Sequence, residues 1–550
     1  MEPMSLLSNR QIIRAALVVL LGFLASGVLG LVRTALISQT FGAGSALDAF
    51  FAAQRIPELI FVLVAGGALG SSFIPVFARS LRAEDHAGAW KLASATITLS
   101  ALAAAALSLL IALAAPWIVP ALLVPGRPPE VQALTVSLTQ IMMLTPFIFS
   151  ISGLMMGILQ SYNNFLLPSL AISMNSVGLI IGTLLLAYWV PSQPGSPAQV
   201  GAANVYGLAW GAVLSALLHL GVQLPGLLRL RREAPGEGWL PIRFLPDRHV
   251  PGVRDVLVMM GPRVLGLGVA QLNFIANTIF ASQMLTGSQA VLTIAWTLMF
   301  TVLGVVGQSV GTALFPTLSG LAASNHFEGY KDRLASALRG VLFLALPATV
   351  GAILLGGPLI ALLFQRGAWT AEDTAATAWA LSFFALGIVG HAGLEVLSRA
   401  FYALEDTRTP VTVGVISLIS NIVLSAVFIQ MIGDPTSLTR GPFAGLALAN
   451  SVTTLLEAAA LWALLRRRIG SLNDGYVVDG LLRTGAAALA MGAALWLFIQ
   501  IAGGLPAAAM AILGLGIGGV VFFGAALALR LDEVRAVLGM ILRRLKPQSN

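Results

Sequence analysis

The sequence predicts an all-α integral membrane protein with about 14 transmembrane helices, and three observations support this fold class. Of the 550 residues, 57% are apolar and only 10% are charged. The mean hydropathy is +0.89, whereas soluble domains carry roughly 25% charged residues. Two long stretches, between Glu130 and Arg229 and between Arg263 and Glu328, contain no Asp, Glu, Lys or Arg. Lipid rather than water must therefore cover much of the surface.

Apolar runs separated by Gly, Pro and polar turn residues set the expected helices, because a spanning helix needs roughly 20 mostly apolar residues. The first run continues to Arg33 without a small-residue cleavage site, so we expect a retained helix rather than a signal peptide. A basic amphipathic tail follows the last span, from Leu531 to about Lys546. The expected spans lie near residues 12–36, 46–78, 91–119, 131–159, 165–190, 203–228, 253–281, 288–319, 335–364, 374–402, 410–432, 442–465, 480–502 and 508–529.

Lysine and arginine are distributed unequally between the two sides of these spans. With the N-terminus in the cytoplasm, 25 of the 31 Lys and Arg residues fall in cytoplasmic segments or their flanks. Three fall outside (Arg127, Arg366 and Arg440) and three lie within spans. Because cytoplasmic loops are enriched in cations, this predicts an even number of spans with both termini cytoplasmic. The net charge of +8 thus indicates membrane topology rather than a nucleic-acid partner.

Several classes of chemistry are excluded. The chain has no Cys, which rules out disulfides, thiolate catalysis and Cys-based metal sites. No GxxxxGK[ST] or HExxH motif occurs. The glycine-rich stretch from Gly514 to Gly519 superficially resembles a dinucleotide loop, but it lies inside an apolar span and is better explained by close helix packing. We therefore expect no ATP-hydrolysing machinery in this chain, no enzyme activity, no cofactor and no metal.

Two matches at nearly one offset indicate an internal repeat. The segment GSSFIP, which begins at Gly70, recurs 241 residues later as GTALFP from Gly311. The loop that closes at Pro168 has a counterpart 242 residues later that closes at Pro410. The alternative is coincidence, since the chain has 57 Gly and 27 Pro residues. A duplication of six spans gives copies that point the same way, related by a pseudo-twofold axis along the membrane normal.

The repeat divides the chain into five parts. We expect an N-terminal lobe at 1–228, a cytoplasmic linker at 229–252, a C-terminal lobe at 253–467, two further helices at 468–530 and a basic cytoplasmic tail at 531–550.

Five motifs give the chain a specific family resemblance. They are FGAGSALDAFF (41–51), FIPVF (73–77), MGPRVLGLGVAQLNFIANTIFAS (260–282), LFQRGAWTAEDT (363–374) and AFYALEDTRTP (400–410). In these motifs and in its number of helices the chain resembles the MurJ (MviN) family of lipid II flippases, part of the multidrug/oligosaccharidyl-lipid/polysaccharide exporter superfamily. The resemblance implies two six-helix lobes around a cavity that opens alternately to each side, with the last two helices forming a groove for the lipid tail.

The resemblance also implies a substrate and a location. The protein would lie in the bacterial inner membrane and move lipid II, a polyprenyl-pyrophosphate-linked peptidoglycan precursor, from the cytoplasmic to the outer leaflet. Its partners would be this lipid, the surrounding membrane lipids and cell-wall synthesis proteins. Two alternatives stay open: a flippase for another polyprenyl-linked glycan, and a non-transporting membrane scaffold that recruits cell-wall synthesis proteins.

A pyrophosphate is an anion that arginine binds well, because the planar guanidinium group donates several hydrogen bonds at once. The resemblance places Arg33, in LGLVR, in the cavity; the alternative is a structural ion pair, for example with Asp48. Asp48 and Asn277 lie in family motifs and are counted with the candidate substrate-binding residues. For Asp48 the alternative is that it orders the first hairpin or pairs with an arginine.

Two further arginines are candidate ligands. Arg55 and Glu58 flank Pro57 in the second helix, and their spacing of three places them on adjacent faces. They are either a ligand cation with its counter-ion or a simple intrahelical pair. Arg263, early in the seventh helix, either binds pyrophosphate or extends to the lipid headgroups.

Members of the family carry further charged residues, mostly arginines, at positions where this chain has uncharged ones. Arg33, Arg55 and Arg263 would therefore have to bind the anion by themselves. The positions concerned are Gly27, Phe61, Val62, Thr297 and Phe300.

Other charged residues within spans are candidates for ion coupling or structural ion pairing, as Glu58 is. Glu395 and Arg399 are four apart on the tenth helix, which predicts a self-neutralised pair. His391 precedes Glu395 by four, but no further ligands accompany it, which argues against a metal site. Glu457, in the twelfth helix, is expected to be an unpaired intramembrane carboxylate that could sense ions or protons.

Overall fold

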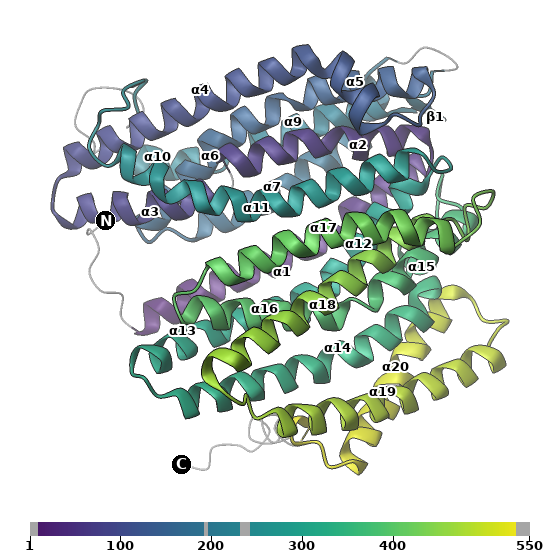
Figure 1. The fold of residues 1–550 in the computed structure, drawn as a ribbon. Helices are drawn as coiled ribbons and strands as arrows, with labels where there is room; N and C mark the ends of the chain where they lie inside the picture. Colours follow the sequence, from purple (N-terminus) through teal and green to yellow (C-terminus); the bar gives the residue numbers. More distant parts are fainter. Residues whose placement is uncertain (1–8, 66, 192–195, 231–241, 535–550) are drawn as a thin grey trace, which may run out of the picture. The chain divides into compact units, whose positions relative to one another are not determined.

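The computed structural model describes residues 9–65, 67–191, 196–230 and 242–534; some side chains within its helices, that of Arg263 included, fall outside the described part. The described chain is helical almost throughout (Figure 1). It divides into two compact units. Unit 1 contains the chain up to Ala290 together with Arg366–Trp369, and unit 2 contains Val291–Gln365 and the chain from Thr370 onward.

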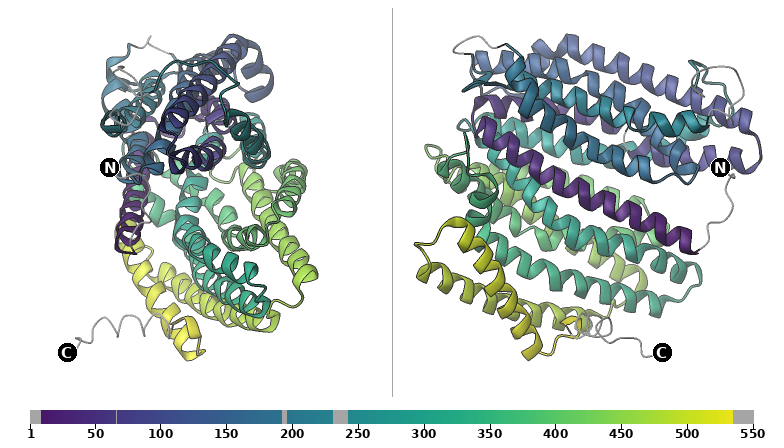
Figure 2. Two further views of the ribbon diagram at one scale, coloured as in Figure 1. Left: turned by 90° about the vertical axis from the view of Figure 1, so that its left-hand side faces the viewer. Right: turned by 180° about the vertical axis from the view of Figure 1, so that it is seen from behind.

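Within each unit, long helices run roughly side by side (Figures 1 and 2). The helices of unit 1 are α1 (Asn9–Phe41), α2 (Ser45–Ile60), η1 (Phe61–Ala65), α3 (Gly67–Arg82), α4 (His86–Ile118), η2 (Val119–Leu123), α5 (Pro129–Met142), α6 (Leu144–Ser161), α7 (Leu166–Ile181), η3 (Gly182–Leu186), α8 (Ala187–Trp189), α9 (Val205–Gly221), α10 (Leu224–Arg229) and α11 (Val253–Ser282). A two-stranded antiparallel hairpin, β1 (Gln199–Val200) and β2 (Ala203–Asn204), precedes α9.

Unit 2 begins within α12 (Ser288–Leu303). Its remaining helices are η5 (Gly304–Gln308), α13 (Ser309–Ala323), α14 (Phe327–Phe364), α15 (Ala371–Ala385), α16 (Ile388–Ala403), α17 (Arg408–Met431), α18 (Phe443–Ile469), α19 (Asp474–Ile501) and α20 (Ala507–Ala528).

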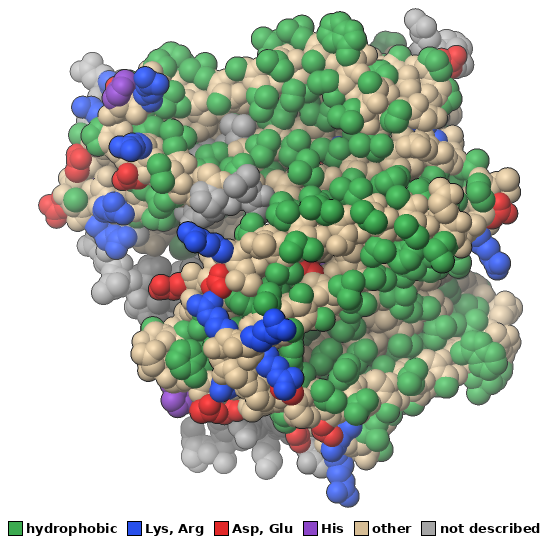
Figure 3. Space-filling view, in the orientation of Figure 1, with side chains coloured by type: hydrophobic (Ala, Val, Ile, Leu, Met, Phe, Trp, Pro, Cys, Tyr) green, Lys and Arg blue, Asp and Glu red, His purple; other side chains and the backbone are tan. Residues whose placement is uncertain are grey.

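The helices have the length and surface that a membrane requires. Among the described residues, nine helices are long and apolar enough to cross a bilayer, or ten if α15 and α16, bent by 44° at their junction, form one span. The predicted total of fourteen stays a prediction. On α4, Leu109, Leu113 and Trp117 are more than 60% exposed, and hydrophobic side chains cover much of the visible surface (Figure 3). Such a surface is stable only against lipid.

Among the described residues, π-helical turns interrupt three of the expected spans. The segment η1 separates α2 from α3, η3 separates α7 from α8, and η5 separates α12 from α13. Phe61, the first residue of η1, and Gly304, the first of η5, are 243 residues apart, close to the offset of the sequence repeat. This recurrence supports a duplication, while the pseudo-twofold axis stays a prediction. π-Helical turns are rare and often lie near functional sites.

The unit boundary and the expected lobes are different divisions. The division into units falls after Ala290, so α11 is counted with unit 1, whereas the repeat assigns residues 253–467 to a C-terminal lobe. The repeat follows from sequence and the units follow from contacts, so the lobes stay a prediction. Residues 231–241 of the linker and residues 535–550 of the basic tail lie outside the described residues.

Unit 1 is held together by unusually close helix packing between α7–η3 and α9. A Cβ atom added at Gly182 would lie 2.6 Å from the Cα of Gly211, and one at Gly178 would lie 2.4 Å from the Cα of Ser215. Only glycine allows backbones to approach this closely. Small residues at helix interfaces are the usual means of association in lipid, where the hydrophobic effect does not drive helices together.

We predict that Gly182→Ala destabilises the protein by about 1–3 kcal/mol, because the new methyl meets backbone that cannot move aside. The thermal unfolding temperature of the purified protein in detergent measures this. Gly221→Ala on α9 is the matched control, since nothing lies within 4 Å of its added Cβ. Equal unfolding temperatures for the two variants would contradict the packing argument.

Candidate functional site

A buried ion pair joins the start of α2 to the turn after η2. Arg127 Nη2 donates to Asp48 Oδ2 at 2.8 Å, and the two side chains are 6% and 4% exposed. Asp48 also accepts backbone N–H bonds, from Gly287 to Oδ2 and from Ala290 to Oδ1, each of 2.8 Å. Because these amides lie at the N-terminus of α12, the Asp48 carboxylate caps that helix, where negative charge is favourable.

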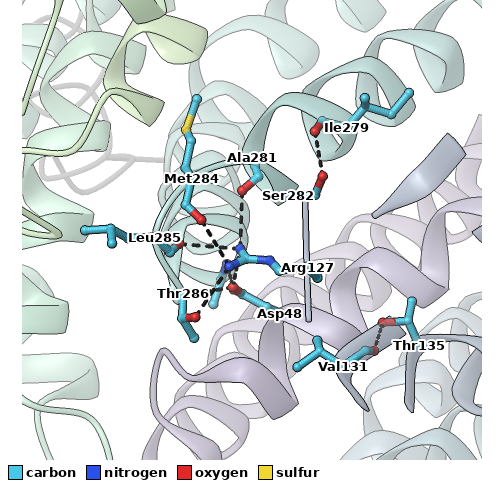
Figure 4. A network of polar contacts seen from close by, with 12 residues as sticks. Asp48, Arg127, Val131, Thr135, Ile279, Ala281, Ser282, Met284, Leu285 and Thr286 are labelled. Carbon is cyan, nitrogen blue, oxygen red and sulfur yellow. Dashed lines mark hydrogen bonds and ion pairs between the residues drawn. The ribbon is translucent and has the colours of Figure 1, made fainter. Parts of the chain in front are cut away.

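The guanidinium group of Arg127 also contacts the turn between α11 and α12 (Figure 4). It donates to the carbonyls of Ala281, Met284 and Leu285 at 3.2, 3.1 and 3.4 Å, and to Thr286 Oγ1 at 3.5 Å. These groups lie in the last turn of α11 or just after it, where helix carbonyls have no partner within the helix. One ion pair thus fixes the end of α11 and the start of α12 to α2.

A small cavity adjoins this ion pair. It measures about 10 Å³, and its polar lining includes Thr135, Thr278, Ser282 and Gln289. A space of this size holds roughly one water molecule. It is far too small for a lipid headgroup, so the surroundings of Asp48 form a packed structural site.

The sequence left two roles open for Asp48: binding the substrate, or ordering the first hairpin or pairing with an arginine. Asp48 does pair with an arginine, but with Arg127 rather than with Arg33. The two partners are 79 residues apart, and from the sequence Arg127 was expected only as a cation outside the membrane. No local motif signals such a contact, which depends on the fold of unit 1.

Arg55 forms a more open ion pair on the same helix. Its Nη1 lies 3.2 Å from Glu58 Oε2, and the side chains of Arg55 and Glu58 are 12% and 44% exposed. The guanidinium carbon also lies 5.2 Å from the centre of the Phe274 ring on α11, a cation–π contact. Glu58 acts electrostatically on Arg33 of α1 as well. The structure therefore groups Arg33, Arg55 and Glu58 in unit 1.

Helix α11, which packs against α2 and α3, contributes unsatisfied amides to this region. The side-chain oxygens of Gln271, Asn273 and Asn277 are buried and have no hydrogen-bond partner among the described residues. Buried polar atoms usually have partners, so these are available to water or a ligand. Arg263 lies on the same helix, but its side chain is outside the described part. Of these three amide residues, only Asn277 was a candidate from the sequence.

The predicted pair on α16 is present. Glu395 and Arg399 form a close ion pair one helical turn apart, and Arg399 Nη1 also donates to the Glu395 carbonyl at 2.8 Å. The side chains are 29% and 24% exposed. Each charge is neutralised within its own helix, which lowers the cost of placing either in a membrane.

The remaining candidates of unit 2 bind uncharged neighbours. His391 Nε2 lies 3.0 Å from Asn450 Oδ1 and 3.4 Å from Thr454 Oγ1. Glu457, expected to be unpaired, accepts a hydrogen bond from the Ser417 hydroxyl. Within the described part of the chain no group of three or more His, Asp or Glu is arranged to hold a metal ion.

Comparison with known proteins identifies the family. A family model described as lipid II flippase MurJ matches residues 37–513. The lipid II flippase MurJ of Burkholderia cenocepacia is 32% identical over 489 residues, which cover 88% of this chain and 90% of that protein. A probable lipid II flippase MurJ of Vibrio cholerae is 29% identical over 472 residues, with coverages of 82% and 83%.

Solved structures agree on the fold. Lipid II flippase MurJ in an inward closed conformation matches with a TM-score of 0.74 at 22% identity, covering 95% of this chain and 100% of that one. An inward-facing multidrug resistance MATE transporter of the MOP superfamily matches with a TM-score of 0.63 at 16% identity, covering 82% and 96%. At these identities the likeness shows the fold alone, an all-α membrane fold. Together with the family match over most of its length, it leads to one conclusion: the chain belongs to the MurJ family of lipid II flippases.

Proposed function

We propose that this chain is a lipid II flippase of the bacterial inner membrane, which moves lipid II from the cytoplasmic to the outer leaflet by alternating access. The family match over residues 37–513 carries this proposal. The concentration of Lys and Arg in one set of loops supports cytoplasmic termini. A membrane potential or an ion gradient supplies the energy; moving one charge through 100 mV provides about 2.3 kcal/mol.

Arg33, Arg55 and Arg263 are the proposed ligands of the pyrophosphate. The Arg55–Glu58 pair is suited to exchange, because Glu58 is 44% exposed. Glu58 accepts one hydrogen bond from Arg55, at 3.2 Å, whereas a pyrophosphate presents several anionic oxygens that can accept from the same guanidinium group. A pyrophosphate can therefore displace Glu58 from Arg55 with a net gain in free energy. In the absence of substrate, Glu58 keeps the arginine from remaining an unpaired charge.

The unsatisfied amides of α11 supply neutral contacts near Arg55. We assign to Asn277, with Asn273 and Gln271, hydrogen bonds to the uncharged part of the headgroup, which presents hydroxyl and amide groups. Their buried oxygens support this role, because a polar group without a partner costs free energy until a ligand or water binds it.

The other charged residues have different proposed roles. Asp48 and the pair formed by Glu395 and Arg399 are structural, because their charges are already neutralised by close partners. Among the described residues, Glu457 has the neutral hydroxyl of Ser417 as its hydrogen-bond partner, so it is the carboxylate that we propose for coupling to an ion or proton.

Helices α19 and α20 are the proposed site of the polyprenyl chain. Both have large apolar side chains directed outward: Leu489 is 73% exposed and Val520 is 76% exposed. The resemblance to the family implies a groove for the lipid tail at these helices, and an apolar surface is what an isoprenoid chain requires.

We predict that Arg33→Ala and Arg55→Ala abolish rescue of a bacterial strain depleted of its own lipid II flippase, and that Arg263→Ala reduces rescue. Each loses charge-assisted bonds worth about 1.5–3 kcal/mol, a roughly 10- to 150-fold loss of affinity per bond. Colony formation after depletion measures rescue.

The exposed Arg248 provides the matched control, since Arg248→Ala removes one cation outside the proposed site. Normal rescue by all three site variants, at normal membrane levels, would show that the anion binds elsewhere. If the chain rescued only a strain that lacks the flippase of another polyprenyl-linked glycan, that lipid-linked glycan rather than lipid II would be the substrate.

We predict that Arg127→Met destabilises the protein by about 3–5 kcal/mol, because it leaves the Asp48 carboxylate buried without its counter-ion. Asp48→Asn should also destabilise, and the double variant should lose much less than the two single losses combined. Thermal unfolding of the four proteins gives this coupling energy. Strictly additive losses would mean that the two side chains do not act as a pair.

A further inference from the structure

A short extended segment of unit 1 crosses the first half of α4. It comprises residues 242–246, which precede α11 and which we call the strap. The Arg243 N–H donates to Ser94 Oγ at 3.0 Å, and the Leu245 N–H donates to Thr98 Oγ1 at 3.0 Å. The Thr98 hydroxyl donates in turn to the Arg243 carbonyl at 3.5 Å. Ser94 and Thr98, one turn apart on α4, thus hold the backbone of the strap.

The strap lies where α4 changes from buried to exposed. Every residue from 92 to 98 is buried, and Ile242 and Leu245 of the strap pack against an apolar cluster that includes this stretch. From Leu102 onward, the outward side chains of α4 are exposed: Leu102 by 45% and Leu109 by 63%. Such an apolar surface requires lipid. The edge of the strap therefore marks the place where α4 enters the hydrocarbon of the membrane.

The length of α4 gives the same boundary. Trp117, near the other end of the helix, is 73% exposed, and tryptophan is enriched at the two surfaces of a membrane. It follows Thr98 by 19 residues, which is a rise of about 28 Å. The hydrocarbon core of a bilayer is about 30 Å thick. The strap, fixed at Thr98, therefore lies at one membrane surface when Trp117 lies at the other.

One large apolar side chain of the strap points away from the protein. Phe244 is 75% exposed, although the residues on either side of it, Arg243 and Leu245, are hydrogen-bonded to α4. In water such an exposed ring gains nothing from folding, whereas at a membrane surface it is buried among the lipids. The backbone contacts thus hold Phe244 at the level where α4 enters the hydrocarbon.

Two exposed cations accompany Phe244. Arg243 precedes it in the strap, and Lys91 lies one turn before the first strap contact, on the same face of α4. Among the residues that the structure describes, neither cation is paired with a carboxylate. Asp247, just after the strap, accepts the backbone N–H of His249 at 2.8 Å. Lys and Arg side chains gather at this end of unit 1, where α3 and α4 meet (Figures 1 and 3).

We propose that the strap is a membrane-surface anchor, in which Phe244 inserts into the lipid while Arg243 and Lys91 bind the phosphate groups of anionic phospholipids. One exposed ring with two cations suits a lipid surface, because a protein partner would cover roughly 800 Å² with a broader apolar centre. Near an anionic surface each Lys or Arg strengthens binding roughly fivefold, so the two cations account for about 25-fold. The anchor fixes the chain that leads into α11.

The absence of cysteine from the chain makes a direct test simple. A nitroxide spin label, itself an apolar ring, is attached at Phe244→Cys in the full-length protein, in nanodiscs of phosphatidylcholine and phosphatidylglycerol. Collisions of the label with a water-soluble nickel complex and with oxygen, which dissolves in lipid, give its depth. Leu109→Cys is the lipid reference, and Ala83→Cys, in the exposed turn after α3, is the water reference. We expect several-fold fewer nickel collisions at 244 than at 83, and equal collisions would overturn the proposal.

The same label distinguishes a lipid surface from a protein partner. Nanodiscs that hold a single copy of the chain contain no partner protein, so protection of the label there supports the anchor. Exposure of the label in nanodiscs, together with protection in native membranes, would show that a protein covers Phe244 and would contradict the proposal.

A matched pair of double variants tests the two cations. Lys91→Gln with Arg243→Gln should move the label at 244 toward the water reference, because anionic-lipid binding weakens about 25-fold, at roughly fivefold per cation. Arg408→Gln with Arg467→Gln removes the same charge from exposed positions of unit 2 and should leave the depth unchanged. An unchanged depth in the first double variant, or equal shifts in both, would contradict binding of the phosphates by Lys91 and Arg243.

A pair of threonine variants tests the attachment of the strap to α4. Thr98→Val removes the hydroxyl that bonds to Leu245 and should increase the mobility of the label at 244. Thr96→Val removes a buried hydroxyl that has no partner among the described residues and should leave the mobility unchanged. Equal mobility in the two variants would show that α4 does not hold the strap at the membrane surface, and would contradict the proposal.

Discussion

The free-energy cost of burying an unpaired charge governs the architecture of this protein. A buried ion can be kept only if its partner and hydrogen bonds offset the loss of water. In the described structure, the buried Arg127 meets Asp48 and the buried Arg339 meets Glu533. Each pair also joins elements that are distant in sequence: α2 with the α11–α12 turn in unit 1, and α14 with the chain after α20 in unit 2. The charges that are costly to bury thus act as the fixed points of each unit.

The same constraint separates structural ions from those suited to bind a substrate. Arg127 and Asp48 are 6% and 4% exposed, and every oxygen of the carboxylate has a partner within the protein. Arg55, in contrast, is paired with a carboxylate that is 44% exposed and lies beside a helix with three buried side-chain amide oxygens that have no partner among the described residues. Only a partly exposed ion pair, such as that of Arg55 and Glu58, can release its cation to an incoming pyrophosphate at a low cost in free energy.

How much of this could be read from the sequence depended on the range of the interactions. Composition and apolar runs predicted the all-α membrane fold, and a spacing of four predicted the pair of Glu395 and Arg399, because these signals are local. The pair of Asp48 and Arg127 was missed because its partners are 79 residues apart and meet only after helices pack. The ion pair of Arg339 and Glu533 was missed for the same reason, since its two residues are 194 positions apart in the sequence. The π-helical turns η1 and η5 were also missed, since apolar periodicity does not reveal one extra residue in a turn.

The central claim is that Arg55 exchanges Glu58 for the pyrophosphate of a polyprenyl-linked substrate. Native mass spectrometry of the purified protein, offered lipid II in competition with a polyprenol that lacks the pyrophosphate, tests it most directly. The account predicts that the wild-type protein retains lipid II, that Glu58→Gln retains it at least as well, and that Arg55→Gln loses roughly tenfold or more in affinity. Equal retention of the two lipids by the wild-type protein, or equal losses in Glu58→Gln and Arg55→Gln, would contradict it.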